Sequence, residues 1–126
     1  MTRSIVLSGI GGQGTVLASR LIASVALSRG VPVRTAETIG MAQRGGTVLT
    51  HVRYGDTPTD VPHTSLVPLG AASLAIAFEP GEAQRVLPYL APDAAMVVAR
   101  RAIPPTTATL AGVDYDGSEQ LAYLKQ

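Results

Sequence analysis

Apolar residues along the chain form either short continuous runs or stripes with helical spacing. Five runs, each predicted to be a strand, cover residues 3–8, 31–36, 47–54, 74–78 and 94–99. After the first run, Leu17, Leu21 and Val25 recur every four residues and form an apolar stripe, which predicts a helix over 14–29. Gly30 and Pro32 then stop that helix. Two further helices are expected over 80–90 and 118–125.

Strands that alternate with helices predict an α/β protein with a Rossmann-like, three-layer α/β/α architecture and a mostly parallel sheet. The first strand, helix and second strand read as a βαβ unit, and a loop is expected over 37–46. The strand at 47–54 has mixed polarity on both faces, which is typical of a position near a sheet edge. Residues 1–126 are expected to form one domain. Because the last helix has little to pack on, we expect a C-terminally truncated chain or a short family member.

Composition narrows the possible chemistry. The chain has 126 residues, of which 46% are hydrophobic and 15% charged, and it contains no cysteine. Disulfides, thiolate zinc sites and cysteine-ligated iron–sulfur clusters are therefore excluded in this chain, and the two histidines have no metal-ligand spacing. No stretch approaches the roughly 20 apolar residues of a membrane span, and the first run is too short for a signal sequence. We expect a cytoplasmic protein that has no membrane contact.

Charge is unevenly distributed although the net charge is only +1. Residues 1–53 hold six arginines and one glutamate, whereas residues 54–126 hold four basic and eight acidic residues. The basic half also carries the glycine-rich loops, which favours an anionic ligand there, although chance segregation of surface charge remains an alternative. No cluster of basic residues with aromatics indicates nucleic-acid binding.

The stretch GIGGQGT, residues 9–15, follows the first strand and opens the first helix. Gly9, Gly11 and Gly14 fit the G-x-G-x-x-G dinucleotide fingerprint, in which glycines allow a tight turn and a close approach to phosphate. The helix N-terminus offers unpaired N–H groups to an anion, and Thr15 adds a hydroxyl. Glu37 lies 23 residues after Gly14, near the position of a ribose-binding acid.

Three interpretations of this loop stay open: an NAD(P) site, a site for another phosphate ligand, or a turn that only packs. Gly12 and the polar Gln13 depart from a simple dinucleotide loop, and a second loop follows Glu37 at once. That second loop contains Gln43, Arg44, Gly45 and Gly46. An arginine before two glycines suits a loop that closes on phosphate or carboxylate, although a solvated surface arginine is an equal alternative.

Three blocks together resemble one family. They are GIGGQG at 9–14, GMAQRGGTVLTHVR at 40–53 and AFEPGEAQRVLPYL at 77–90. They resemble the gamma subunit or domain of 2-oxoacid:ferredoxin oxidoreductases over roughly residues 4 to 104, and within that family the beta subunit of indolepyruvate ferredoxin oxidoreductases. The second block is the most specific of the three. The family's gamma unit is usually longer than 126 residues.

The resemblance implies a non-redox subunit of an enzyme that oxidatively decarboxylates a 2-oxoacid, such as indolepyruvate, to an acyl-CoA. Thiamine diphosphate, Mg²⁺ and iron–sulfur clusters are then expected on a larger partner subunit, with ferredoxin as electron acceptor. This chain would contribute subunit packing and part of a coenzyme A site, and alone it would be inactive and hold no tightly bound cofactor. The residues carried over to the two ligand loops are Gly11, Gly12, Gln13, Gly14, Gln43, Arg44, Gly45 and Gly46. The alternative is a free-standing NAD(P)-binding module.

Overall fold

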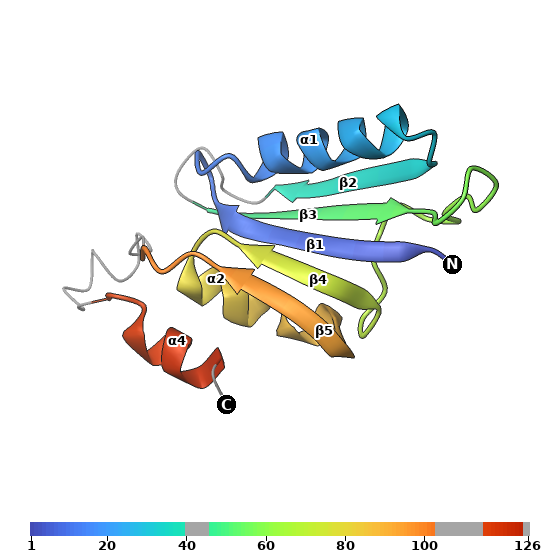
Figure 1. The fold of residues 1–126 in the computed structure, drawn as a ribbon. Helices are drawn as coiled ribbons and strands as arrows, with labels where there is room; N and C mark the ends of the chain where they lie inside the picture. Colours follow the sequence, from blue (N-terminus) through green and yellow to red (C-terminus); the bar gives the residue numbers. More distant parts are fainter. Residues whose placement is uncertain (40–45, 103–114, 125–126) are drawn as a thin grey trace.

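A computed structural model describes residues 1–39, 46–102 and 115–124 of the chain. Its centre is a five-stranded sheet in the order β2-β3-β1-β4-β5 (Figure 1). The strands are β1 (Arg3–Ile10), β2 (Val33–Ile39), β3 (Thr47–Tyr54), β4 (Ala72–Ala77) and β5 (Leu90–Val98). β1 pairs parallel with β4, and β4 pairs parallel with β5, whereas β3 pairs antiparallel with both β1 and β2. The α/β prediction is confirmed, and the sheet is mixed rather than mostly parallel.

β3 changes the predicted βαβ unit. β1 and β2 run in the same direction, but β3 lies between them and hydrogen-bonds to both. Residues 47–54 lie near a sheet edge, as expected, because β3 is next to the edge strand β2, but they do not form the edge themselves. The polar side chains of His51 and Thr50 on this strand are buried. β2 also continues through Glu37 to Ile39, where a loop was expected.

Helices cover both faces of the sheet, as the three-layer prediction requires. α1 (Thr15–Ser28) packs on β1, β2 and β3, where Ala18 and Ile22 contact a cluster built on Ile5, Leu7 and Val52. On the opposite face, α2 (Pro80–Arg85) and the 3-10 helix η2 (Leu87–Tyr89) lie behind β4 in Figure 1. That face holds a second cluster, whose buried members are Val6, Val67, Ala72, Ala75 and Val86. α4 (Ser118–Leu124) contacts α2.

The segment 80–98 divides differently from the prediction. The helix expected over 80–90 ends at Arg85, a 3-10 turn follows, and β5 begins at Leu90 rather than at residue 94. Pro88 explains the early end, because proline has no N–H for the helical ladder and clashes with the preceding turn. The remaining predicted elements match the structure to within a few residues at each end.

Candidate functional site

Two strand-to-helix turns lie side by side at one end of the sheet, where the parallel strands β1 and β4 have their carboxyl ends. β1 leads through the glycine loop into α1, and β4 leads through Phe78 and Glu79 into α2. Because β1 and β4 are parallel neighbours, both turns lie at the same end of the sheet. There the Phe78 N–H donates to the Ser8 carbonyl at 2.8 Å. The antiparallel β3 begins at this end of the sheet too, since Thr47 pairs with Ile10. In open α/β sheets, ligands bind where neighbouring strands send their helices to opposite faces, as β1 and β4 do here.

The structure joins the first glycine loop to Gly46, the last residue of the second loop. The Gly11 N–H donates to the Gly46 carbonyl at 3.0 Å, so the first loop touches the end of the second. Gly12 and Gly14 have φ values of 92° and 90°, in the left-handed region that favours glycine. Gln43, Arg44 and Gly45 lie outside the described residues, so their predicted ligand role stays a prediction.

Gly9 has a packing role. A Cβ placed on it would lie 2.5 Å from Thr15 Oγ1, 3.0 Å from Gln13 Oε1 and 3.2 Å from the Phe78 Cβ. Only a residue without a side chain lets the loop, α1 and the end of β4 approach this closely. The first glycine of the motif is thus explained without a ligand.

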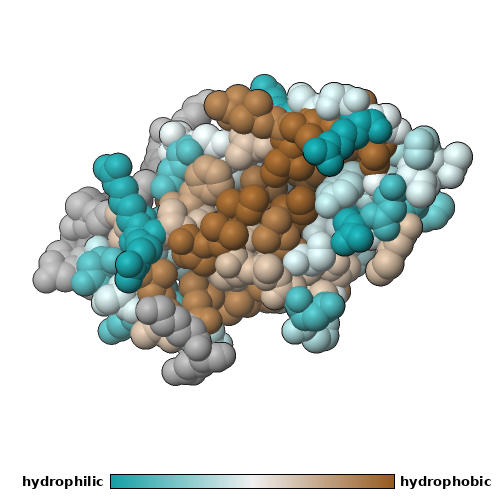
Figure 2. Space-filling model, viewed as in Figure 1, coloured by the Kyte–Doolittle hydropathy of each residue, from teal (hydrophilic) through white to brown (hydrophobic). Residues whose placement is uncertain are grey.

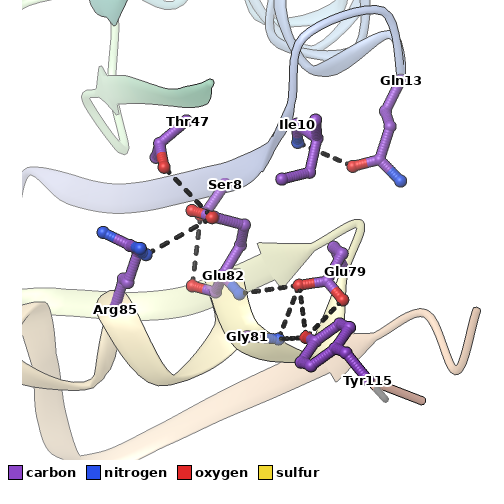
Figure 3. Close-up of polar contacts among 9 residues, drawn as sticks. All are labelled: Ser8, Ile10, Gln13, Thr47, Glu79, Gly81, Glu82, Arg85 and Tyr115. Atoms are coloured by element: carbon purple, nitrogen blue, oxygen red, sulfur yellow. Dashed lines mark hydrogen bonds and ion pairs between the residues drawn. The ribbon is translucent and has the colours of Figure 1, made fainter. Parts of the chain in front are cut away.

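Gln13 is also engaged by the protein itself (Figure 3). Its Oε1 accepts from the Ile10 N–H at 2.7 Å, and its Nε2 donates to the Phe78 carbonyl at 2.9 Å. The amide therefore joins the end of β1 to the end of β4, in the crevice between the two turns. In this position Gln13 organises the loop, and one of its two amide N–H donors is already used.

The N-terminus of α1 remains available. Its N-cap is Gly14, and no side chain caps it. A cavity of about 320 Å³ lies against this end, with Gly12, Gly14, Thr15 and Leu17 among its lining residues. The Thr15 hydroxyl is buried and has no hydrogen-bond partner among the described residues. Unpaired N–H groups and the positive end of the helix dipole make such a terminus suitable for an anion.

The dinucleotide interpretation is not favoured by this geometry. Glu37 and Leu7 both pair with Thr50 of β3, from opposite sides. Because β3 separates them, Glu37 lies about 10 Å from β1 in the plane of the sheet, twice the spacing of adjacent strands. A ribose-binding acid normally follows the strand next to the glycine loop.

In the neighbouring turn, from β4 into α2, side chains of the protein itself bind the N–H groups that begin the helix. Glu79 is the N-cap of α2, and its carboxylate accepts from the N–H groups of Gly81 at 2.7 Å and Glu82 at 3.3 Å. The Tyr115 hydroxyl donates to Glu79 Oε2 at 2.6 Å and accepts from the Gly81 N–H at 3.0 Å (Figure 3). Burial, followed by the contact with Glu79, raises the pKa of Tyr115. These contacts explain the FEPGE sequence as a helix start.

Glu82 connects β1, β3 and α2 at the same end of the sheet. Its carboxylate accepts from Thr47 Oγ1 at 3.1 Å and from Ser8 Oγ at 3.4 Å, and Arg85 Nε lies 3.3 Å away (Figure 3). Burial raises the pKa of Glu82, and Arg85 and the two hydroxyls oppose that change. No local sequence pattern indicated the contributions of Ser8 and Tyr115, because both depend on elements distant along the chain.

His51 has a structural position on β3. Its Nδ1 accepts from the Val67 N–H at 3.1 Å, and its ring meets Tyr89 edge-on at a centroid distance of 5.6 Å. Burial lowers the pKa of His51, which keeps the imidazole neutral. Within residues 1–39, 46–102 and 115–124 no group of three or more His, Cys, Asp or Glu residues could hold a metal ion. Over the same residues, no helix has the length and hydropathy needed to cross a membrane.

Solved structures share this fold. The gamma subunit of a keto/oxoacid ferredoxin oxidoreductase from Geobacter sulfurreducens aligns with a TM-score of 0.61 at 23% identity, covering 78% of this chain and 50% of that one. Subunit PORC of a pyruvate oxidoreductase from Thermotoga maritima aligns at 0.62 and 19% identity, over 92% and 58%. The 2-oxoglutarate:ferredoxin oxidoreductase from Magnetococcus marinus aligns at 0.66 and 18% identity, over 98% of this chain but only 23% of that chain.

Sequence relatives are closer. Indolepyruvate oxidoreductase subunit IorB of Archaeoglobus fulgidus is 40% identical over 121 residues, which are 96% of this chain and 58% of the relative. IorB of Pyrococcus horikoshii is 38% identical over 94% of this chain and 56% of the relative. The chain thus spans somewhat more than half the length of these relatives. The model of the pyruvate ferredoxin/flavodoxin oxidoreductase family matches residues 4–122. This match confirms the resemblance carried by the three sequence blocks, and the chain belongs to that family.

Proposed function

We propose that this chain is a small, non-redox subunit of a 2-oxoacid:ferredoxin oxidoreductase, an enzyme that oxidatively decarboxylates a 2-oxoacid to an acyl-CoA. The observation that carries the proposal is the identity of about 40% with an indolepyruvate oxidoreductase subunit over nearly the whole chain. An aryl 2-oxoacid such as indolepyruvate is the substrate that this relationship favours. The isolated chain would be inactive.

The redox chemistry would belong to a larger partner subunit. This chain has no cysteine that could ligate an iron–sulfur cluster. Thiamine diphosphate with Mg²⁺ would stabilise the carbanion on the partner, and iron–sulfur clusters there would pass electrons to ferredoxin. In this proposal the assembly is cytoplasmic, and the small subunit supplies packing surface together with part of the coenzyme A site.

The coenzyme A site would lie where the two glycine loops meet. The Gly11–Gly46 hydrogen bond, the uncapped N-terminus of α1 and the unpartnered Thr15 hydroxyl support this location. Backbone N–H groups after Gly12 and Gly14 would bind a phosphate group, with Gln43 and Arg44 of the second loop closing over it. Gly9 and Gln13 would act indirectly, by holding the loop in place.

The test is Arg44→Ala in the intact, anaerobically purified complex. We expect the KM for coenzyme A to rise about tenfold or more, since a charge-assisted contact to phosphate contributes about 1.5–3 kcal/mol. The KM for the 2-oxoacid should stay near its wild-type value in a dye-reduction assay. Arg101→Ala, at an exposed arginine beyond β5, is the matched control and should change neither constant.

Unchanged kinetics in Arg44→Ala would remove Arg44 from the site. The activity itself is tested separately, because a wild-type chain that purifies without any thiamine diphosphate and iron–sulfur protein would contradict the subunit assignment. A titration of the isolated chain with NADH addresses the alternative module. Tight NADH binding that Gly11→Val abolishes would favour that alternative.

A further inference from the structure

One carboxylate joins the two segments that border the glycine loops. Glu82 of α2 is only 4% exposed. Its Oε1 accepts from Thr47 Oγ1 at 3.1 Å, and its Oε2 accepts from Ser8 Oγ at 3.4 Å (Figure 3). Ser8 directly precedes the first loop, and Thr47 directly follows the last glycine of the second loop. The residue before one loop and the residue after the other therefore bind the same side chain.

We call Ser8, Glu82 and Thr47 the carboxylate bridge. Burying a carboxylate costs free energy unless hydrogen-bond donors compensate it. Here Thr47, Ser8 and Arg85 supply those donors, and Ser8 Oγ also lies 3.2 Å from the Glu82 carbonyl, to which it donates. Because hydrogen bonds require narrow ranges of distance and angle, a bridge of this kind fixes the relative positions of β1, β3 and α2 more closely than apolar contact does.

The carboxylate bridge and α1 lie on opposite faces of the sheet. Side chains alternate along β1, and since Ile5 and Leu7 pack on the α1 side, Ser8 points to the α2 side. The α1 side is apolar, as the brown band across the strands in Figure 2 shows, and Leu17 and Leu21 of α1 are 63% and 60% exposed. A carboxylate on the α2 side does not reach the N-terminus of α1, so its influence there must pass through the backbone.

The backbone path from the carboxylate bridge to the first loop is short. Thr47 follows Gly46, whose carbonyl accepts from the Gly11 N–H at 3.0 Å. Gly11 in turn precedes the left-handed Gly12 and Gly14, which direct the chain into α1. A displacement at the start of β3 would therefore move the Gly46 carbonyl and, with it, the loop that begins α1.

We propose that Glu82 is a positioning residue for the anion site at the N-terminus of α1. It holds the start of β3 against the end of β1, so that the Gly46 carbonyl stays within reach of the Gly11 N–H. The first loop then keeps the shape that presents its own N–H groups to a phosphate, and Glu82 does not touch the ligand. This inference rests on the proposed function and adds to the coenzyme A site a residue that lies outside both glycine loops.

The test is steady-state kinetics of the intact, anaerobically purified complex. Thr47→Val removes only the hydroxyl that donates to Glu82, and Glu82→Ala removes the carboxylate. We expect each to raise the KM for coenzyme A about three- to tenfold, while kcat and the KM for the 2-oxoacid stay near their wild-type values. Because both changes break one bond, the double variant should raise the KM no further than the larger single effect. Glu82→Gln keeps an acceptor oxygen for Thr47 and should stay close to wild type.

Val86→Ala is the matched control for a general loss of stability. Val86 is the C-cap of α2, is 1% exposed, and packs in the apolar cluster on the same face of the sheet, outside the carboxylate bridge. Its truncation should destabilise the chain, because it leaves a cavity in that cluster. The KM for coenzyme A should nevertheless stay at its wild-type value.

Hydrogen exchange gives a second readout that does not depend on the identity of the ligand. It is followed by mass spectrometry in the intact complex, on a peptide that spans residues 9–16. Thr47→Val and Glu82→Ala should speed exchange in this peptide, since the bond from the Gly11 N–H to the Gly46 carbonyl opens more often. Val86→Ala should leave its exchange near the wild-type rate.

The outcomes separate the two proposals. If Arg44→Ala raises the KM for coenzyme A and neither Thr47→Val nor Glu82→Ala does, the positioning role is overturned and the proposed function stays intact. A higher KM in Glu82→Ala without any change in Thr47→Val would make Glu82 a direct ligand contact, which also overturns the positioning role. If no thiamine diphosphate and iron–sulfur protein accompanies the wild-type chain, the proposed function fails and this inference fails with it.

Discussion

The two strand-to-helix turns at the edge of the sheet solve the same structural problem differently. Each must leave a parallel strand and begin a helix whose first N–H groups have no partner within the helix. In the turn into α2, the Glu79 carboxylate accepts from these groups, and it is held in place by a hydrogen bond from the Tyr115 hydroxyl. The turn into α1 ends in left-handed Gly14 and has no capping side chain.

The difference separates a structural helix start from one that is open to a ligand. At α2, a carboxylate of the chain occupies the place that an external anion would take. At α1, the side chain of Gln13 hydrogen-bonds to the backbone of Ile10 and Phe78 and does not cap the helix. The two turns therefore predict different responses to substitution: loss of stability alone at α2, and loss of stability together with altered loop geometry at α1.

The largest effect is expected for Glu79→Ala. The change removes the cap of α2 and leaves the partly buried Tyr115 hydroxyl and Gly81 N–H with fewer partners. We expect the free energy of unfolding to fall by about 2–4 kcal/mol, from a lost cap and a lost charge-assisted hydrogen bond. Urea unfolding measures it, with Glu119→Ala in the exposed first turn of α4 as control. A change below about 0.5 kcal/mol would show that Glu79 is not the cap that the structure describes.

Gly9→Ala should have the next largest effect. The new Cβ would lie 2.5 Å from Thr15 Oγ1, which is closer than real contacts allow, so α1 or the loop must shift. We expect a loss of about 1–3 kcal/mol, as for other overpacked sites. Thr15→Ala removes the nearest atom, and the double variant should recover part of the loss.

Gly14→Ala sharpens the comparison between two glycines of one motif. A Cβ at Gly14 meets nothing within 4 Å, so only its left-handed φ of 90° opposes the substitution. The cost should be about 1–2 kcal/mol, and Thr15→Ala should not relieve it. Equal rescue of both variants by Thr15→Ala would contradict the separate roles assigned to Gly9 and Gly14.

Much of the fold follows from local pattern, and the position of β3 does not. The runs at 3–8 and 74–78 and the helix at 14–29 depend on apolar spacing and on nearby Gly and Pro residues, which the sequence displays directly. Strand order depends on which edges pair, and no local signal placed 47–54 between β1 and β2. The early end of α2 was a readable signal, because Pro88 lies inside the predicted helix.

The candidate site divides in the same way. The glycine loop and its position at the N-terminus of a helix were predictable, because strand, glycines and helix are contiguous in the sequence. The roles inside the loop were not, since Gly9 and Gln13 are both explained by Phe78, which is 65 residues from Gln13. The exposure of Leu17 and Leu21 was also beyond reach, because the stripe shows only that a helix has an apolar side and not what covers it.

Gln13→Ala tests whether the amide organises the loop. It removes the bonds to the Ile10 N–H and the Phe78 carbonyl, and we expect a loss of about 1–2 kcal/mol of stability. Coenzyme A binding by the intact complex should weaken as well, although Gln13 would not touch the ligand. Gln84→Ala on α2 is the control. Weaker binding without any change in stability would instead make Gln13 a direct ligand contact.

The smallest expected effect is the pH dependence of stability contributed by Glu82. It tests whether the Glu82 carboxyl, in the turn into α2, is shielded from solvent. Burial raises the pKa of Glu82 above its usual value of 4.5, so the folded chain binds this proton more tightly than the unfolded chain. The resulting stability is present in full below pH 4.5 and is lost as pH rises through the folded pKa. Glu82→Gln lacks this titration, so the stability of wild type relative to the variant should decline between pH 4 and pH 7 in urea unfolding. Asp56 and Asp60, whose pKa values are lowered by their partners, act in the opposite direction near pH 3.8 and cancel in the comparison. A difference that grows with pH would mean that Thr47, Ser8 and Arg85 stabilise the ionised carboxylate more than burial opposes it, and that the turn into α2 is open to solvent.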